Sequence, residues 1–145
     1  MLELKCYNLQ KGSDKSPYSQ FQPSMPLTLY AVSDGPPSLA VRQALKYLNL
    51  EHTLVNVDFG LGEHMTEEFA KKNPQKEIPV LEDDGFYLGE SNAILQYLAG
   101  KYAKDETLYP KDPKSRAIVN HRLCFNLSTY YRYISEHVAS KNSNL

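Results

Sequence analysis

Residues 31–42, AVSDGPPSLAVR, place two serines at the junction between an apolar stretch and the start of a helix. Pro36 and Pro37 stand where a helix tolerates proline, at its entrance, and apolar residues recur after them at helical spacing. The first-turn N–H groups of a helix are unpaired and its dipole is positive there. The junction therefore predicts an anion-binding site, to which Ser33 or Ser38 can supply a hydroxyl.

The remaining composition argues against several other kinds of chemistry. Cys6 and Cys124 form no C-x-x-C motif, which argues against a metal site, a dithiol oxidoreductase and a disulfide framework, and favours a reducing, cytoplasmic setting. The 145 residues include 16 basic and 17 acidic side chains with no long basic run, so no nucleic-acid partner is expected. No apolar run is long enough for a membrane span or a signal peptide. We expect a small-molecule partner.

The elements around the junction form a βαβ unit, then a loosely helical segment, a hairpin and a helix. Apolar alternation and turn residues delimit these elements. The predicted bounds are strand 27–32, helix 37–49, strand 51–59, a loop with a short helix at 62–75, strand 78–83, a turn at Asp83-Asp84-Gly85 and helix 90–103. A chain of 145 residues is long enough for one ordinary domain and too short for two of typical size.

The two ends of the chain differ from this central part. Residues 1–25 are polar and show neither helical nor strand periodicity, so they are expected to be a disordered leader. Asp112 and Pro113 are typical of an N-cap and a first helical residue, and they open a long helix that should end near Val138. Apolar and aromatic side chains surround much of this helix, so we expect it to self-associate or to fray.

Three segments together resemble the glutathione S-transferases, most closely the insect delta and epsilon classes and their unclassified relatives. They are GEH at 62–64, NPQKEIPVLEDDGFYLGESNAILQYLAGKYA at 73–103 and LYPKDPKSRAIVNHRLCFN at 108–126. The resemblance implies an α/β fold with a thioredoxin-like glutathione-binding domain (βαβαββα) at residues 26–104. A linker at 105–112 and the first helix of a truncated all-α C-terminal domain at 113–145 would follow.

The resemblance also implies a binding site for reduced glutathione. Pro79 would be cis and would turn the backbone of Ile78 toward the cysteinyl amide of the ligand, as an added strand would. Ser91, with the N–H groups of the helix that it opens, would meet the γ-glutamyl carboxylate. Glu90 would balance the ammonium group of the ligand.

The resemblance also implies glutathione-binding roles for His64, Lys76 and Asn92, two of which differ in residue type from the family. His64 and Lys76 would lie toward the glycyl carboxylate, and Lys76 stands where these classes usually have histidine. Asn92 stands where they usually have arginine, which removes a possible charge-assisted bond to glutathione. Lysine keeps a cationic or hydrogen-bonding partner at position 76, whereas the loss of the arginine at position 92 is expected to affect the affinity for the ligand.

The donor that activates the glutathione thiol departs from the family pattern. Set against the family's S-x-P-C opening, the usual serine position falls on Gly35, Ser38 replaces the cysteine and Ser33 lies two residues early. The sequence leaves three donors open: the Ser33 hydroxyl, which we take as the catalytic one, the Ser38 hydroxyl, or backbone N–H groups alone. Tyr30 is expected to point into the sheet.

The implied activity is transfer of the glutathione thiolate to small hydrophobic electrophiles, a detoxification-type reaction. Glutathione would be a co-substrate, no cofactor or metal is expected, and the full-length form would be a cytoplasmic homodimer. An alternative is a catalytically weak or inactive glutathione-binding or interaction module that arises from a truncated transferase. A plain thioredoxin-like redox protein is disfavoured because the dithiol is missing.

Overall fold

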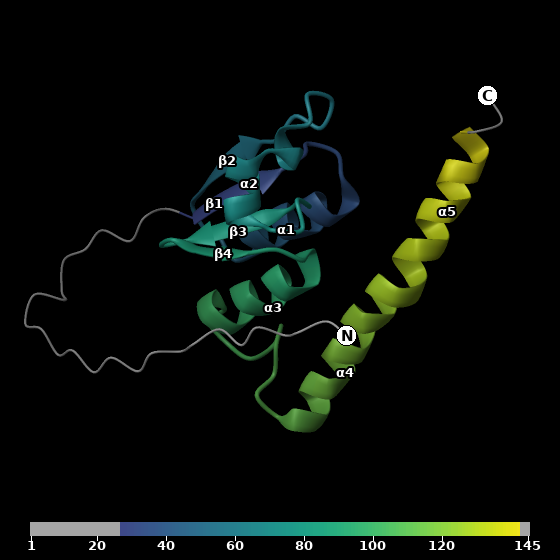
Figure 1. Ribbon diagram of the computed structural model, residues 1–145. Helices are drawn as coiled ribbons and strands as arrows, with labels where there is room; N and C mark the ends of the chain where they lie inside the picture. The colour runs from purple at the N-terminus through teal and green to yellow at the C-terminus, as the bar shows by residue number, and fades with distance from the viewer. Residues whose placement is uncertain (1–26, 143–145) are drawn as a thin grey trace, which may run out of the picture.

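Four strands form the sheet on which the domain is built (Figure 1). The computed structural model describes residues 27–142, so the leader predicted at residues 1–25 lies outside the described part. The strands are β1 (Leu27–Ala31), β2 (His52–Asn56), β3 (Val80–Asp83) and β4 (Phe86–Leu88), in the order β2-β1-β3-β4. β1 pairs with β2 in parallel, and the other neighbours are antiparallel. The predicted βαβ unit and hairpin are confirmed.

Helices cover both faces of this sheet (Figure 1). α1 (Pro36–Tyr47) and α3 (Ser91–Tyr102) pack on one face, while the 3-10 turn η1 (Glu63–Met65) and α2 (Glu67–Lys72) lie on the other. The larger core fills the α1/α3 side with Leu27, Leu29, Ala31, Val41, Leu45, Leu81, Ile94 and Leu98. The smaller core, on the α2 side, consists of Val57, Phe69 and Val80. This three-layer arrangement is the expected thioredoxin-like fold.

The turn between β3 and β4 is the predicted two-residue hairpin. Asp83 pairs with Phe86, and the two residues between them have positive φ angles, +51° at Asp84 and +78° at Gly85. Aspartate and glycine are among the residues that tolerate this left-handed geometry, which matches the twist of the flanking strands. The turn therefore fixes the register that brings Asp83 to the end of β3.

The second strand is shorter than predicted. β2 ends at Asn56, although the alternation of residues 51–59 predicts a longer element. β2 lies at the edge of the sheet and pairs only with β1, which itself ends at Ala31. Val57 still donates its N–H to Ala31 O at 2.9 Å and is buried, whereas Thr53 is exposed. The alternation thus indicates one inward position correctly but not the extent of pairing.

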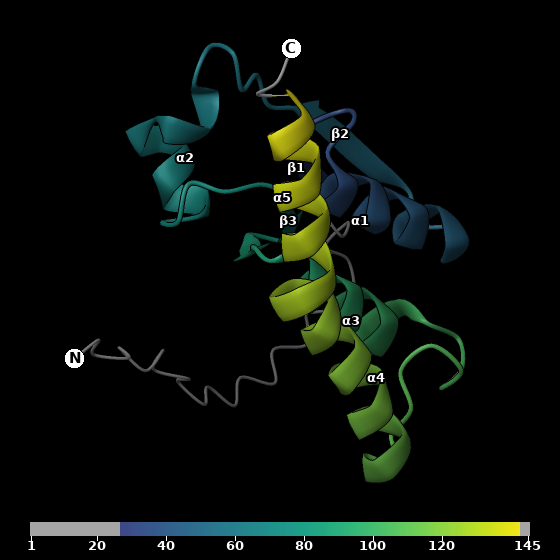
Figure 2. The ribbon, with the colours of Figure 1, turned by 90° about the vertical axis from the view of Figure 1, so that its right-hand side faces the viewer.

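The C-terminal segment is a long helical rod with an irregular middle (Figure 2). It comprises α4 (Pro113–Phe125), a π-helical turn η2 (Asn126–Tyr130) and α5 (Tyr131–Asn142), so the single helix predicted to end near Val138 is interrupted and extends further. Asp112 caps it as predicted, because its side chain accepts from Ser115 N at 2.9 Å. No described helix is long and apolar enough to span a membrane.

This rod leaves much of its apolar surface uncovered. α4 contains no buried residue. Ile118 is 65% exposed, Tyr133 67% and Leu127 49%. The self-association or fraying expected of this helix stays a prediction, and its position depends on specific polar contacts with the α/β domain.

Candidate functional site

A cavity of about 630 Å³ opens between the α/β domain and the rod. Five residues implied by the resemblance line it together: Ile78, Pro79, Glu90, Ser91 and Asn92. The first turn of α1 contributes Pro36 and Pro37, and the rod contributes Leu127, Tyr130, Tyr131 and Ile134. The volume is in the range of small-molecule sites. One wall is polar and built on the start of α3, and the facing wall is aromatic and apolar.

The start of α3 is the best anion-binding position in this cavity. Ile94 N bonds Glu90 O at 2.9 Å, which begins the helix, and no side chain caps the first turn. The N–H groups of the first turn therefore have no partner within the helix, and the hydroxyl of Ser91 lies beside them. Glu90 has a φ of +61°, a conformation that costs a non-glycine residue about 1–3 kcal/mol and is concentrated at functional sites.

The start of α1 is a poorer anion site than predicted. Pro36 and Pro37 occupy its first two positions and carry no N–H, so two of the expected donors do not exist. The N-cap is Gly35, with no side-chain cap, and Leu39 N bonds its carbonyl at 2.9 Å. Ser38 is the third helical residue and is 1% exposed, so it does not cap the helix. Proline content, visible in the sequence, was the signal against this site.

The loop before β3 is held by a buried residue that the sequence reasoning missed. The Ile78–Pro79 peptide bond is cis, as predicted. Asn73, 5% exposed, donates from Nδ2 to Glu77 O at 2.8 Å and accepts from Gln75 N at 3.2 Å. It thereby fixes the backbone that leads into Ile78. The Asn-Pro dipeptide at residues 73–74 is a turn signal that could have indicated this role.

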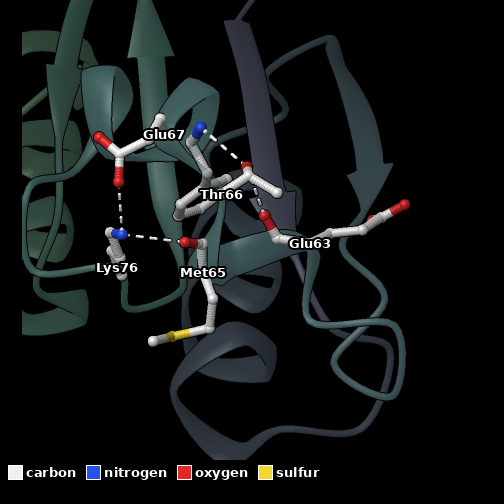
Figure 3. A network of polar contacts seen from close by, with 6 residues as sticks. Glu63, Met65, Thr66, Glu67 and Lys76 are labelled. Carbon is white, nitrogen blue, oxygen red and sulfur yellow. Dashed lines mark hydrogen bonds and ion pairs between the residues drawn. The ribbon is translucent and has the colours of Figure 1, made fainter.

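Lys76 lies outside this cavity and connects its own loop to η1 and α2 (Figure 3). Its ammonium group donates to Met65 O at 2.9 Å and to Glu67 Oε1 at 3.0 Å. His64 also lies outside the cavity lining, where its ring stacks on Phe59 with centroids 3.8 Å apart. The Nδ1 atom of His64 is buried without a hydrogen-bond partner. Contacts of Lys76 and His64 with a glycyl carboxylate stay predictions.

The side chain of Ser33 is exposed on the loop before α1. Its carbonyl accepts from Arg42 Nη1 at 3.1 Å, and it is not among the residues that line the cavity. Its role toward a thiol therefore stays a prediction.

Tyr30 lies on the α2 side of the sheet, away from the thiol site that the sequence analysis considers. Its hydroxyl donates to Glu82 Oε2 at 2.8 Å, and its ring packs edge-on against Phe69. Burial, together with the neighbouring Glu82 carboxylate, raises the pKa of Tyr30 to about 12. Tyr30 therefore stays protonated and engaged with Glu82.

Val32 fills the space that a side chain at position 35 would need. A Cβ added at Gly35 would lie 2.6 Å from Val32 Cγ2, closer than carbon atoms can pack. The hydroxyl of Ser38 would be 3.7 Å from the same Cβ. Position 35, where the family's opening motif has serine, therefore has room for glycine but not for a side chain while Val32 keeps its place.

The thioredoxin-like sheet, the cis-proline loop, the start of α3 and the facing helical rod together form the candidate binding site. The family model for the glutathione S-transferase N-terminal domain matches residues 25–100. The chain belongs to the glutathione S-transferase family, and the relatives it matches include insect delta- and epsilon-class proteins.

Individual relatives cover about three quarters of this chain. It is 46% identical over 105 residues to Glutathione S-transferase 1 of Manduca sexta, covering 70% of this chain and 48% of that relative. A crystal structure of a diazinon-metabolizing glutathione S-transferase of the silkworm Bombyx mori is 70% identical, with a TM-score of 0.75, over 77% of this chain and 55% of that one. A glutathione transferase homologue of Drosophila mojavensis with bound glutathione is 40% identical, with a TM-score of 0.69, over 71% and 47%. The chain spans about half the length of the curated relatives it matches.

Proposed function

We propose that this chain binds reduced glutathione and transfers its thiolate to small hydrophobic electrophiles. The observation that carries the proposal is the convergence of Ile78, Glu90 and Ser91 on one cavity whose opposite wall is aromatic. A peptide with two carboxylates and an ammonium group suits the polar wall, and an apolar electrophile suits the other. The Drosophila mojavensis relative with bound glutathione supports the ligand assignment.

In this proposal the residues divide the ligand between them. Ser91 and the first-turn N–H groups of α3 hold the γ-glutamyl carboxylate, and Glu90 faces its ammonium group. The backbone of Ile78, beside Pro79, bonds the cysteinyl amide, and His64 and Lys76 lie on the side of the glycyl carboxylate. Asn92 completes the polar wall.

The reaction is a nucleophilic substitution or addition at an electrophilic carbon. The thiol loses its proton to solvent, the sulfur electron pair forms the new C–S bond, and in a substitution the leaving group departs with its bonding pair. A free thiol with a pKa of about 8.5 is only a few per cent ionised at neutral pH. Hydrogen-bond donors that stabilise the thiolate therefore increase the reactive fraction, and the Ser33 hydroxyl is the proposed donor. Glutathione is the co-substrate, and the proposal includes no cofactor or metal.

The proposed setting of the reaction is the cytoplasm. The two cysteines, Cys6 and Cys124, form no C-x-x-C pair, which suits a reducing compartment. A homodimer is the proposed active form, and the exposed apolar surface of the rod supports such association.

Ser33→Ala is expected to raise the pKa of the bound glutathione thiol by about one unit, because a hydrogen bond to a charged acceptor contributes about 1.5–3 kcal/mol. Ultraviolet absorbance of the thiolate, titrated against pH in the complex, measures this directly. Ser135→Ala, on the exposed side of α5, is the matched control. An unchanged thiol pKa would transfer the role to Ser38 or to backbone N–H groups.

The packing at Gly35 predicts that a serine at this position fits only if the side chain of Val32 is made smaller. Gly35→Ser alone should lower the free energy of unfolding by about 1–3 kcal/mol, because its Cβ collides with Val32. The double variant Val32→Ala/Gly35→Ser should recover much of that loss and increase turnover about tenfold, as the added hydroxyl lowers the thiol pKa. Urea unfolding and initial rates measure both effects. Equal instability of the single and double variants would contradict the steric explanation.

Conjugation of 1-chloro-2,4-dinitrobenzene, followed by absorbance, tests the activity. Turnover well above the uncatalysed rate supports the transferase, and retention on glutathione resin without turnover would contradict it. Diazinon is the second electrophile to test, because the silkworm relative is described as diazinon-metabolizing.

A further inference from the structure

The buried side chain of Asn92 connects the glutathione wall of the cavity to the opposite wall. Asn92 is 5% exposed in the first turn of α3, and its Nδ2 donates to Leu123 O of α4 at 2.7 Å. Its amide group thus joins α3 directly to α4. A buried amide donor with such a short bond is costly to leave unpaired, so the link constrains both helices.

This link meets α4 immediately before the helix changes geometry. Asn126 N bonds the carbonyls of both Arg122 and Leu123, and Tyr131 N then bonds Asn126 O in the wider π pattern. The next carbonyl along, that of Cys124, accepts the hydroxyl of Ser128 at 3.0 Å. Side chains that insert into the backbone ladder are a recognised cause of such local irregularity, and π turns recur at functional sites.

The residues that follow the link form the apolar wall. Leu127, Tyr130 and Tyr131 line the cavity from η2 and the start of α5. Because α4 buries no residue of its own, apolar packing alone holds the rod weakly. The other described polar connection between α3 and α4 runs through Tyr109, whose hydroxyl lies 3.2 Å from Gln96 Oε1 and 3.1 Å from Asn120 Oδ1, further from the π turn.

We propose that Asn92 is a positioning residue for the second substrate: its bond to Leu123 O fixes the π turn and so places the aromatic wall over the glutathione site. This inference rests on the proposed transferase function. It assigns to Asn92 a role in electrophile selection, through Leu127, Tyr130 and Tyr131, in addition to its place in the polar wall. The amide of an asparagine is suited to this link, because a backbone carbonyl accepts from it without introducing a buried charge.

The test uses Asn92→Leu, which keeps the branched shape and the helix but removes the donor. We expect the KM for 1-chloro-2,4-dinitrobenzene to rise at least about fivefold, and by a larger factor than the KM for glutathione, whose wall Asn92 also lines. Asn120→Leu, which removes an amide of α4 at the Tyr109 connection, is the matched control and should leave the ratio of the two KM values unchanged. A rise confined to the KM for glutathione, or no change in either, would overturn the proposal.

Hydrogen exchange tests the positioning role of Asn92 without any measurement of enzyme activity. In Asn92→Leu the amides of residues 123–131 should exchange about tenfold faster than in the unmodified chain, with the β1 and β3 amides unchanged. Unaltered exchange at 123–131 would overturn the positioning role whether or not the chain is a transferase. Faster exchange in a chain that conjugates no electrophile would support the positioning role of Asn92 but reject the proposed transferase function. The failure of one hypothesis can therefore be told from the failure of the other.

Discussion

Replacing Ser91 with alanine is expected to weaken glutathione binding about ten- to hundredfold while leaving the stability of the chain almost unchanged. Ser91 is the first residue of α3, lines the cavity and makes no side-chain hydrogen bond among the described residues. A hydrogen bond to a carboxylate contributes about 1.5–3 kcal/mol, which corresponds to this loss of affinity. Alanine is at least as good a helix former, so folding should not suffer.

Isothermal titration of the Ser91→Ala variant with reduced glutathione measures the affinity, and urea unfolding measures the stability. Ser135→Ala again provides a control, since that serine is exposed on α5 and bonds only Arg132 O within the described structure. Equal affinities of the Ser91→Ala variant and the unmodified chain would show that the α3 start does not hold the ligand.

Asp83→Asn is expected to lower the free energy of unfolding by about 2–3 kcal/mol at neutral pH. Asp83 is 6% exposed, and its Oδ2 accepts from Lys101 Nζ at 2.6 Å and from the hydroxyls of Tyr97 and Tyr102 at 2.7 Å each. Asparagine has nearly the same shape but no charge, so the bonds weaken without a cavity. The expected loss in the free energy of unfolding lies at the lower end of the range for a broken buried ion pair. The Lys101 side chain is 46% exposed, so solvent screens its charge.

The same cluster predicts how stability depends on pH. Burial by itself raises the pKa of Asp83, but the hydrogen bonds from Lys101, Tyr102 and Tyr97 outweigh it and leave the pKa below its ordinary value. A carboxylate with a lowered folded pKa stabilises the protein above the unfolded pKa of about 3.9, and this contribution is lost as the pH falls through the folded value. The stability difference between the unmodified chain and Asp83→Asn should therefore shrink below about pH 4.

Urea midpoints by circular dichroism between neutral and acidic pH check both statements. Asp84→Asn removes one charge from the adjacent, exposed turn position and should change stability by less than about 0.5 kcal/mol. A difference between the unmodified chain and Asp83→Asn that stays constant down to pH 2 would contradict the assigned role of the carboxylate.

The elements that local patterns determine could be predicted from the sequence. The Asp84-Gly85 turn and the Asp112 cap each depend on a few neighbouring residues, and the structure confirms them. Apolar alternation located the inward position of Val57 but not the end of β2, because pairing depends on the distant strand β1. Local chemistry cannot show where a strand loses its partner.

Part of the candidate site could also be predicted from the sequence. The spacing of Ile78, Glu90 and Ser91 resembles that of the family, and the structure brings these three residues to one cavity. The bond of Asn92 to Leu123 joins positions 31 residues apart, and the bonds of Lys76 to Met65 and Glu67 arise from a loop contact. No periodicity in the sequence indicates such pairs.

Titration of the 15N-labelled chain with reduced glutathione is the most direct test of the central claim, that the α3 start and the cis-proline loop form a glutathione site. We expect saturable binding of one ligand, with the largest amide shifts at Ile78 and residues 90–93. Oxidised glutathione and free glutamate serve as comparison ligands. No saturable binding, or shifts confined to residues outside the cavity, would show that these two elements do not form a glutathione site.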